Sequence, residues 1–306
     1  MEKTPFIWLD GKLVEWDRAQ VHVLTHSLHY GMAVFEGIRA YKTPNATAVF
    51  RLQEHVRRLF DSAHILGMKI PYTREQISEA CRETVRANKM DEAYIRPLVF
   101  IGDGAMGVYA PSNPIRTTIV CWKWGAYLGE EGLKRGIRAK VSSFTRSHPN
   151  ATMNKAKATA NYVNSMLAKR EARECGYDEA ILLDPTGMVA EGSGENLFMV
   201  RDGVLTTPPL PNVLGGITRD TVLQIAADLK VPTAVRNFAR DELYIADEAF
   251  FCGTAAEITP IREVDGRQVG EGKMGAVTQK IQESYFELVR GKGTNAERNA
   301  RWLTNV

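Results

Sequence analysis

The sequence predicts an α+β protein with two lobes. Its 306 residues exceed one ordinary domain and fit two. Apolar runs of strand length come in clusters separated by amphipathic helices instead of alternating strictly with them, which favours α+β over α/β. Residues 124–133 break both periods and contain three glycines. We therefore expect this loop to connect a smaller lobe, residues 1–123, to a larger lobe, residues 134–306.

The smaller lobe is expected to open with a hairpin at 6–16 that turns at Asp10 and Gly11. Thr73 and Gln76 have the spacing of a capping box and predict a helix that continues to residue 88. The other expected elements are apolar or amphipathic runs: strands at 35–41, 48–52, 94–101 and 117–122, and a helix at 53–66.

In the larger lobe a strand is expected at 137–144, followed by a long helix at 157–174 that stops at Gly176. The remaining expected elements follow in order: helices at 217–229 and 275–290, and strands at 232–238 and 248–252. The tail, 291–300, is polar and is expected to be loose.

The bulk composition excludes several classes of partner. Lys and Arg number 39 against 36 Asp and Glu, a net charge of +3, which is too balanced to indicate nucleic acid or an anionic membrane. The four cysteines form no C-x-x-C and predict reduced structural thiols. No apolar run has the length of a membrane span, and residues 1–5 carry no apolar signal core. A cytoplasmic location is therefore expected.

The most informative segment reads EGSGENLF at 191–198 and follows an apolar run at 180–183. Glycines beside the carboxylate of Glu191 would let a ligand approach the backbone closely. Physical reasoning alone favours the plainer interpretation, a β-bulge with a solvated Glu191.

Two other motifs are expected to carry no chemistry. Residues 102–107 match G-x-G-x-x-G, but Pro111 and Pro114 follow where a dinucleotide site needs a helix. His22, His26 and His29 have ligand-like spacing without a matching carboxylate or cysteine, so no metal site is predicted.

Two further segments contain residues that could bind a ligand. Small residues surround Lys155 and Lys157, and the physics alone does not choose between these two amines. Gly215 and Gly216 run directly into a predicted helix, whose first amides would bind a phosphate. An ordinary helix N-cap is the alternative there.

These segments resemble those of the fold-type IV pyridoxal-phosphate aminotransferases, and more closely the bacterial branched-chain amino acid aminotransferases. The matching motifs are E-G-x-G-E-N-L-F at 191–198, A-K-x-x-x-N-Y at 156–162 and G-I-T-R at 216–219. The resemblance extends from the first hairpin to Arg262. It implies the fold-type IV fold and pyridoxal 5'-phosphate as cofactor, with no metal.

The resemblance also assigns roles to residues. Lys157 would hold the cofactor as a Schiff base and move the substrate's α-proton, while Glu191 would keep the pyridine nitrogen protonated. Arg58 matches the family's phosphate arginine, and only the motif register separates it from Arg57. The other residues implied to bind the cofactor are Tyr162, which would contact the ring oxygen, and Ile217, Thr218 and Thr254, which would hold the phosphate.

For the substrate, the resemblance implies an apolar, aromatic pocket with a cationic edge at Arg96 for the distal carboxylate of glutamate. The other residues implied to bind substrate are Tyr30, Phe35, Gly37, Tyr94, Met106, Val108, Trp124, Tyr127, Thr254 and Ala255. In the family the 106–108 loop reaches the neighbouring subunit's site. A homodimer at least is therefore expected, with a trimer of dimers as the larger option.

The activity implied is reversible transfer of the amino group between L-leucine, L-isoleucine or L-valine and 2-oxoglutarate. The partners expected are therefore small amino acids and 2-oxo acids. The main rival within the same fold is a D-amino acid or (R)-amine transaminase. Outside it, a catalytically silent binding protein would need neither cofactor absorbance nor amine transfer.

Overall fold

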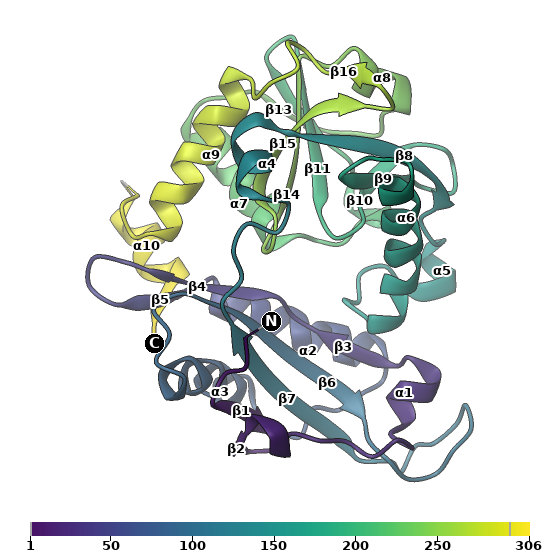
Figure 1. Cartoon of the computed structure of the whole chain (residues 1–306), viewed down its shortest axis with the longest axis vertical. Helices are drawn as coiled ribbons and strands as arrows, with labels where there is room; N and C mark the ends of the chain where they lie inside the picture. The colour runs from purple at the N-terminus through teal and green to yellow at the C-terminus, as the bar shows by residue number, and fades with distance from the viewer. Residues whose placement is uncertain (1, 294) are drawn as a thin grey trace. The chain divides into compact units, whose positions relative to one another are not determined.

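The computed structural model describes residues 2–293 and 295–306, and the chain divides into two compact units (Figure 1). Unit 1 comprises residues up to Trp124 together with Ala156–Ala160 and Leu288–Val306, and unit 2 comprises Gly125–Lys155 and Asn161–Glu287. The units depart from the predicted lobes because two later segments pack with unit 1. One pairs with a strand at Val34, and the other ends in a strand of the unit 1 sheet.

Unit 1 is built on one sheet with the order β17-β5-β4-β6-β7-β1-β2, and β3 pairs with β6. Its elements are β1 Phe6–Leu9, β2 Lys12–Glu15, α1 His26–Tyr30, β3 Ala33–Phe35, β4 Ile38–Lys42, β5 Thr47–Phe50, α2 Leu52–Ile65, α3 Arg74–Ala87, β6 Ala93–Ile101, β7 Ile115–Trp122, α10 Ala296–Trp302 and β17 Leu303–Asn305. The apolar faces of α2 and α3 pack with the sheet in a common core, which includes Leu59, Ile77 and Ile95. The Thr73–Gln76 capping box is confirmed.

In unit 2 the strand pairings close on themselves. The order β10-β9-β8-β15-β14-β11 returns to β10, and β12 and β13 extend the sheet beyond β11. The elements are α4 Glu130–Arg135, β8 Ile137–Thr145, α5 Pro149–Thr152, α6 Tyr162–Glu174, β9 Glu179–Leu183, β10 Val189–Gly192, β11 Asn196–Arg201, β12 Val204–Thr207, α7 Ile217–Asp228, β13 Thr233–Val235, α8 Arg240–Tyr244, β14 Glu248–Gly253, β15 Glu257–Val264, β16 Arg267–Gln268 and α9 Ala276–Val289, of which the last two residues belong to unit 1. Closure removes open edges from this ring and places Glu191 and Asn196 opposite each other where it shuts.

Several predicted elements have different bounds in the structure, among them the strand expected at 232–238, which is shortened to β13. The strand expected at 35–41 is divided into β3 and β4 by Glu36 and Gly37, which lie opposite Pro97 in the continuous strand β6. Proline has no N–H to donate, so the pairing of β6 with β3 and β4 is interrupted there, whereas the pairing of β6 with β7 continues through Pro97. The expected loop 124–133 is also wrong in part, because α4 begins at Glu130.

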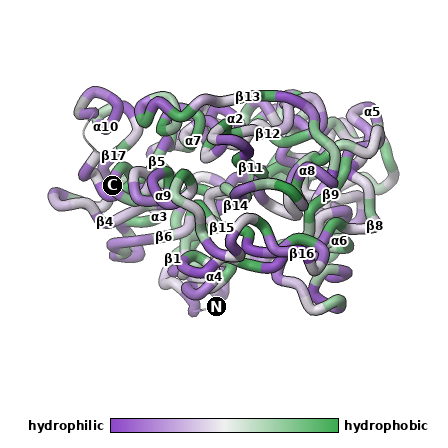
Figure 2. Tube along the Cα trace, turned by 90° about the horizontal axis from the view of Figure 1, so that it is seen from above, coloured by the Kyte–Doolittle hydropathy of each residue, from purple (hydrophilic) through white to green (hydrophobic). Residues whose placement is uncertain are grey.

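The tail is the largest correction to the predicted fold. The expectation of a loose segment at 291–300 is wrong in part, because α10 begins at Ala296 and β17 follows it, while position 294 lies outside the described residues. Figure 2 colours much of α10 as hydrophilic, in keeping with the polar composition that suggested a loose chain. The order comes from Trp302, which is fully buried and whose carbonyl accepts the Arg51 amide at 2.6 Å.

Candidate active site

Lys157 lies in an extended segment of unit 1, not in the helix predicted at 157–174. Its carbonyl accepts the Phe35 amide at 3.1 Å, and its own amide donates to Ser62 Oγ at 3.0 Å. The neighbouring residue Ala158 bridges to Val34, so β3 captures the segment and α6 begins only at Tyr162. The side chain of Lys157 is half-buried, with Nζ 5.0 Å from the centre of the Phe35 ring, whereas Lys155 is exposed. This difference favours Lys157 as the reactive amine.

Arg58 projects from α2 toward a fully buried carboxylate, Glu36. Arg58 Nε donates to Glu36 Oε1 at 2.6 Å and Nη2 donates to Oε2 at 2.8 Å, so the pair is bidentate. Arg57, one residue earlier, points to the exposed Asp61 with an N–O distance of 3.7 Å. The two arginines therefore have different surroundings, and Arg58 stays the predicted phosphate ligand.

Five of the predicted substrate residues gather around Tyr94 in unit 1. The Arg96 guanidinium donates from Nη2 to the Tyr94 hydroxyl at 3.1 Å and stacks 4.6 Å from the centre of the Phe35 ring. The rings of Tyr94 and Trp124 meet edge to face at 4.5 Å. A Cβ on Gly37 would lie 2.0 Å from the Tyr94 hydroxyl oxygen, so only glycine fits there.

Arg96 retains binding capacity in this cluster. No hydrogen-bond acceptor among the described residues reaches its Nε, although that atom is buried. Its recorded contacts are the Tyr94 hydroxyl and three aromatic faces, with no carboxylate from the described part of the chain. A desolvated guanidinium among aromatic rings suits a carboxylate ligand.

The loop that contains Met106 and Val108 is held to α1 through Tyr30. The Gly107 amide donates to the Tyr30 hydroxyl at 3.0 Å, and the Gly107 carbonyl lies 2.7 Å from His26 Nε2. Val108 is 92% exposed. The loop thus presents an apolar side chain outward from an anchored backbone, which suits a contact with another molecule.

Glu191 is the centre of the predicted cofactor residues in unit 2. A β-bulge does occur there, since the register of β10 against β9 shifts between Val189 and Glu191. The carboxylate is nevertheless only 4% exposed, so the expectation of a solvated side chain is wrong. Oε2 accepts the Leu214 amide at 3.1 Å and Asn196 Nδ2 at 3.3 Å. Oε1 accepts no hydrogen bond from the described residues and lies 2.7 Å from Arg146 Nη2, outside hydrogen-bond geometry.

Asn196 connects Glu191 to the glycine turn that precedes α7. Its Nδ2 also donates to the Leu214 carbonyl at 3.0 Å, and a Cβ on Gly216 would lie 1.8 Å from its Oδ1. Gly216 is the N-cap of α7 and supplies no side-chain cap. The amides of Ile217 and Thr218 begin this 12-residue helix, and Thr218 is buried. Such a helix start, with open space beside Gly215, suits a phosphate.

The remaining predicted residues of unit 2 lie at the ends of elements. Thr254 and Ala255 form the turn between β14 and β15, and β14 pairs Cys252 with Asn196. This pairing brings the turn to the same end of the ring as the Glu191 segment. Tyr162 is the first residue of α6, and the Tyr127 ring lies 5.4 Å from Lys169 Nζ. Hydrogen bonds therefore join Glu191 to Asn196 and to the segment that precedes α7. Tyr127 lies apart from this set, beside Lys169.

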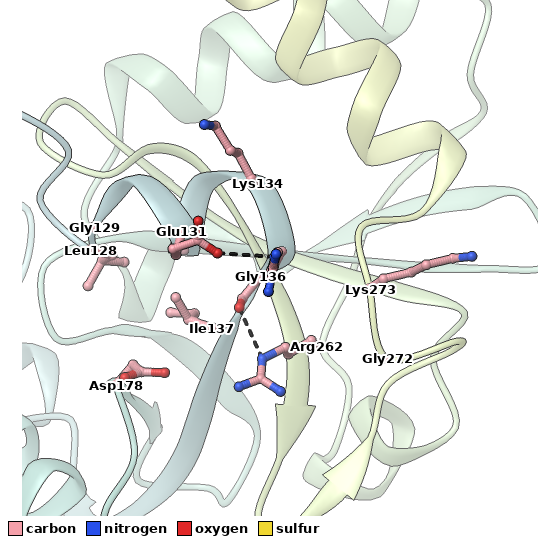
Figure 3. Close-up of a pocket in the computed structure, with 12 residues that line it drawn as sticks. Leu128, Gly129, Glu131, Lys134, Gly136, Ile137, Asp178, Arg262, Gly272 and Lys273 are labelled. Atoms are coloured by element: carbon pink, nitrogen blue, oxygen red, sulfur yellow. Dashed lines mark hydrogen bonds and ion pairs between the residues drawn. The ribbon is translucent and has the colours of Figure 1, made fainter.

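A separate cavity of about 620 Å³ lies in unit 2, lined by residues of the α4 region, Asp178, Arg262 and the 272–273 turn (Figure 3). None of its lining residues belongs to the predicted cofactor or substrate sets. Its two arginines are already engaged: Arg135 pairs with Glu131 at 3.1 Å, and Arg262 Nε donates to the Gly136 carbonyl at the same distance. We therefore assign no function to this cavity.

Residues 33–264 match the family model described as amino-transferase class IV, and this span includes Phe35, Lys157 and Thr254. The chain belongs to the class IV aminotransferases. A curated relative, the branched-chain-amino-acid aminotransferase of Pseudomonas aeruginosa, is 56% identical over 98% of this chain and 97% of the relative.

Solved structures of class IV aminotransferases match over nearly the whole chain. The branched-chain amino acid aminotransferase of Escherichia coli superposes with a TM-score of 0.96 at 47% identity, covering 99% of both chains. The branched-chain amino acid aminotransferase of Thermobaculum terrenum, solved in its PLP-form, gives a TM-score of 0.92 at 36% identity and also covers 99% of both chains. The predicted family and α+β, fold-type IV architecture are thereby confirmed.

The sequence missed two residues that support the predicted site, Arg146 and Glu36. Arg146 lies against Glu191 but stands outside every motif, and no local pattern could have revealed it. Glu36 had a weak signal, because it stands between Phe35 and Gly37, which the resemblance implies to bind substrate. Within the described part of the chain, no helix combines the length and the apolar character needed to cross a membrane.

Proposed function

We propose that this class IV aminotransferase catalyses reversible amino transfer between L-leucine, L-isoleucine or L-valine and 2-oxoglutarate, with pyridoxal 5'-phosphate as cofactor. The observation that carries the proposal is the buried Glu191 carboxylate. Its Oε1 accepts no hydrogen bond from the described residues, although Arg146 Nη2 lies 2.7 Å away, and a glycine-opened helix start lies next to the carboxylate through Asn196. A ring N–H and a phosphate are groups that this pair of features fits. The relatives named above share the activity in their names.

Each cofactor residue supplies one requirement. Lys157 provides the amine for covalent attachment, and its Nζ would then take the proton from the substrate's α-carbon and deliver it to the exocyclic carbon of the bound cofactor. Glu191 holds the proton on the ring nitrogen, and Tyr162 is proposed to bond the ring oxygen. Bound pyridoxal phosphate supplies an electron-withdrawing ring that stabilises negative charge beside the α-carbon. The phosphate is assigned to Arg58, Thr254 and the amides of Ile217 and Thr218.

The same pocket must accept an aliphatic side chain in one half-reaction and a distal carboxylate in the other. The Phe35, Tyr94 and Trp124 rings offer apolar contact, while Arg96 offers a guanidinium whose Nε lacks a protein acceptor among the described residues. The substrate α-carboxylate is assigned to the amides of Thr254 and Ala255. D-amino acid or (R)-amine transfer is not favoured, since the relatives reported above carry branched-chain names.

We further propose that the chain works as a homodimer at least. The supporting feature is the anchored loop with exposed Val108, which would complete the substrate site of a second copy together with Met106. A trimer of dimers and a cytoplasmic location stay predictions.

The test is a panel of L- and D-amino donors against 2-oxoglutarate, together with cofactor absorbance of the wild type and of Lys157→Ala. We expect turnover of L-leucine, L-isoleucine and L-valine, and loss of both transfer and the lysine-dependent absorbance in the variant. Absence of turnover with all three L-donors would reject the substrate assignment. Full turnover by Lys157→Ala would reject the proposed role of Lys157.

A further inference from the structure

Glu36 is a buried carboxylate with no role in the mechanism above. It lies between β3 and β4 and is fully buried. Two cationic or potentially cationic groups from α2 reach it: Arg58 through two hydrogen bonds of 2.6 and 2.8 Å, and His55 Nδ1 at 2.7 Å. The carboxylate therefore holds one edge of the Arg58 guanidinium, Nε and Nη2, in a single orientation.

The chain places this cluster by two independent constraints. Glu36 stands opposite Pro97, where the strand ladder breaks, and its amide donates to the Pro97 carbonyl at 2.9 Å. His55 and Arg58 are three residues apart on α2, so both side chains leave the same face of the helix. Backbone geometry on each side thus aims the acceptor and the donors at one another.

We propose that Glu36 is a positioning residue, which fixes the Arg58 guanidinium in the orientation that receives the cofactor phosphate. The inference rests on the proposed function, specifically on Arg58 as a phosphate ligand. An unsupported arginine would have to lose its side-chain freedom whenever the cofactor binds. With the bidentate pair in place, the Arg58 side chain loses this conformational entropy when the protein folds, before the cofactor binds. The pair also neutralises the arginine charge inside unit 1 when no phosphate is bound.

Charge balance supports an ionised Glu36. Burial favours the neutral carboxyl, but the Arg58 charge and the hydrogen bonds from Arg58 and His55 outweigh it and hold the pKa of Glu36 well below its usual range. Burial lowers the pKa of His55, and the nearby Glu36 carboxylate only partly opposes this. The cluster thus consists of an anion and a cation with an imidazole that burial keeps toward its neutral form.

The experiment separates phosphate recognition from cofactor attachment. Apoenzyme of the full chain is titrated with pyridoxal 5'-phosphate and with pyridoxal. The dissociation constant for pyridoxal divided by that for pyridoxal 5'-phosphate measures the affinity that the phosphate adds, and this quotient is the ratio used below. Glu36→Gln is expected to lower this ratio about tenfold to a hundredfold, as expected for charged hydrogen bonds that lose their geometry. Pyridoxal affinity should change little. Glu36→Asp is measured alongside, because it keeps the charge but is too short for the same bidentate contact.

Asp10→Asn is the matched control, since Asp10 pairs with Arg116 at 2.6 Å elsewhere in unit 1. It should leave the ratio unchanged, and thermal unfolding of all variants reports any general loss of stability. Arg58→Met tests the phosphate ligand itself. An unchanged ratio in Arg58→Met would overturn the Arg58 assignment and the inference built on it.

A double variant tests whether Glu36 acts through Arg58. In an Arg58→Met background, Glu36→Gln should lower the ratio no further, because the residue it positions is gone. If Arg58→Met lowers the ratio while Glu36→Gln and Glu36→Asp leave it at the wild-type value, the inference fails and the phosphate assignment stands. Additive losses in the double variant would also overturn it.

Discussion

Arg146 and Glu191 form a buried ion pair, with 2.7 Å between Arg146 Nη2 and Glu191 Oε1. Arg146 directly follows β8 and Glu191 lies in β10, and the closed ring of unit 2 brings these two segments together. Arg146 is itself held by Ser165 Oγ at 3.2 Å and by its amide, which donates to the Leu183 carbonyl. The contact therefore fixes the position of the carboxylate to which the ring nitrogen is assigned.

Arg146→Met should therefore reduce transamination on the order of a hundredfold, because it leaves the Glu191 charge buried without its partner. Phosphate anchoring should survive, so pyridoxal 5'-phosphate should still bind. Steady-state rates and cofactor absorbance measure the two effects. Arg173→Gln, which removes an exposed arginine of α6, serves as the control. Wild-type rates in Arg146→Met would contradict the role given to the pair.

Gly37→Ala should disrupt the aromatic cluster of unit 1. The added Cβ would stand 2.0 Å from the Tyr94 hydroxyl oxygen, so the Tyr94 ring must move and the hydrogen bond from Arg96 must break. We expect the KM for glutamate to rise above its wild-type value by a larger factor than the KM for leucine does, because Arg96 loses its hydrogen bond to Tyr94. Kinetics with both donors test this, and the effect should shrink in a Tyr94→Ala background, where the ring is absent.

The sequence motifs indicated the residues to which chemistry is assigned, but not the residues that contact them. Lys157, Glu191 and Thr218 lie in short motifs with glycines and other small residues. Arg146 and Glu36 reach this set through tertiary contacts, which leave no local periodicity. The helix predicted at 157–174 failed for a related reason: alanines favour a helix, but β3 captures the backbone of Lys157 and Ala158.

In the fold, too, the elements set by neighbouring residues were predicted, and the element set by a distant contact was not. Capping at Thr73, the turn at Asp10 and Gly11, and the amphipathic pattern of α2 are properties of adjacent residues, and each was predicted. The order of the tail depends on Trp302 finding a place beside Arg51 and Phe50. A polar composition gave no sign of that distant contact, so the tail was predicted incorrectly.

Trp302→Ala should destabilise unit 1 by about 3–5 kcal/mol, the range for removing a fully buried large aromatic side chain. The loss includes the Arg51 guanidinium stacked 4.3 Å from the ring centre and the edge contact with Phe50. Denaturant unfolding monitored by circular dichroism measures it. Val163→Ala, which shortens an exposed side chain on α6, should change the free energy of unfolding by less than about 0.5 kcal/mol. Equal effects of the two substitutions would contradict the burial of the tail.

No catalytic role is assigned to Glu195, but its surroundings predict that the free energy of unfolding depends on pH. Burial, followed by the nearby Glu179 carboxylate and to a lesser degree Glu191, raises the pKa of Glu195 to about 8, although Lys169 and the Gly194 amide oppose the rise. The folded state thus holds a proton that the unfolded chain, near the ordinary carboxyl value of 4.5, releases.

A raised carboxyl pKa contributes stability that is complete below the unfolded value and is lost as the pH rises through the folded value. The wild type should therefore lose stability between about pH 4.5 and 8 relative to Glu195→Gln. The variant keeps an oxygen to accept the Gly194 amide, which donates to Glu195 Oε2 at 3.0 Å, but it has no proton to lose. Thermal unfolding of both proteins across this range checks the sign. A constant difference between the two melting temperatures from about pH 5 to pH 8 would show that Glu195 does not bind this proton in the folded protein.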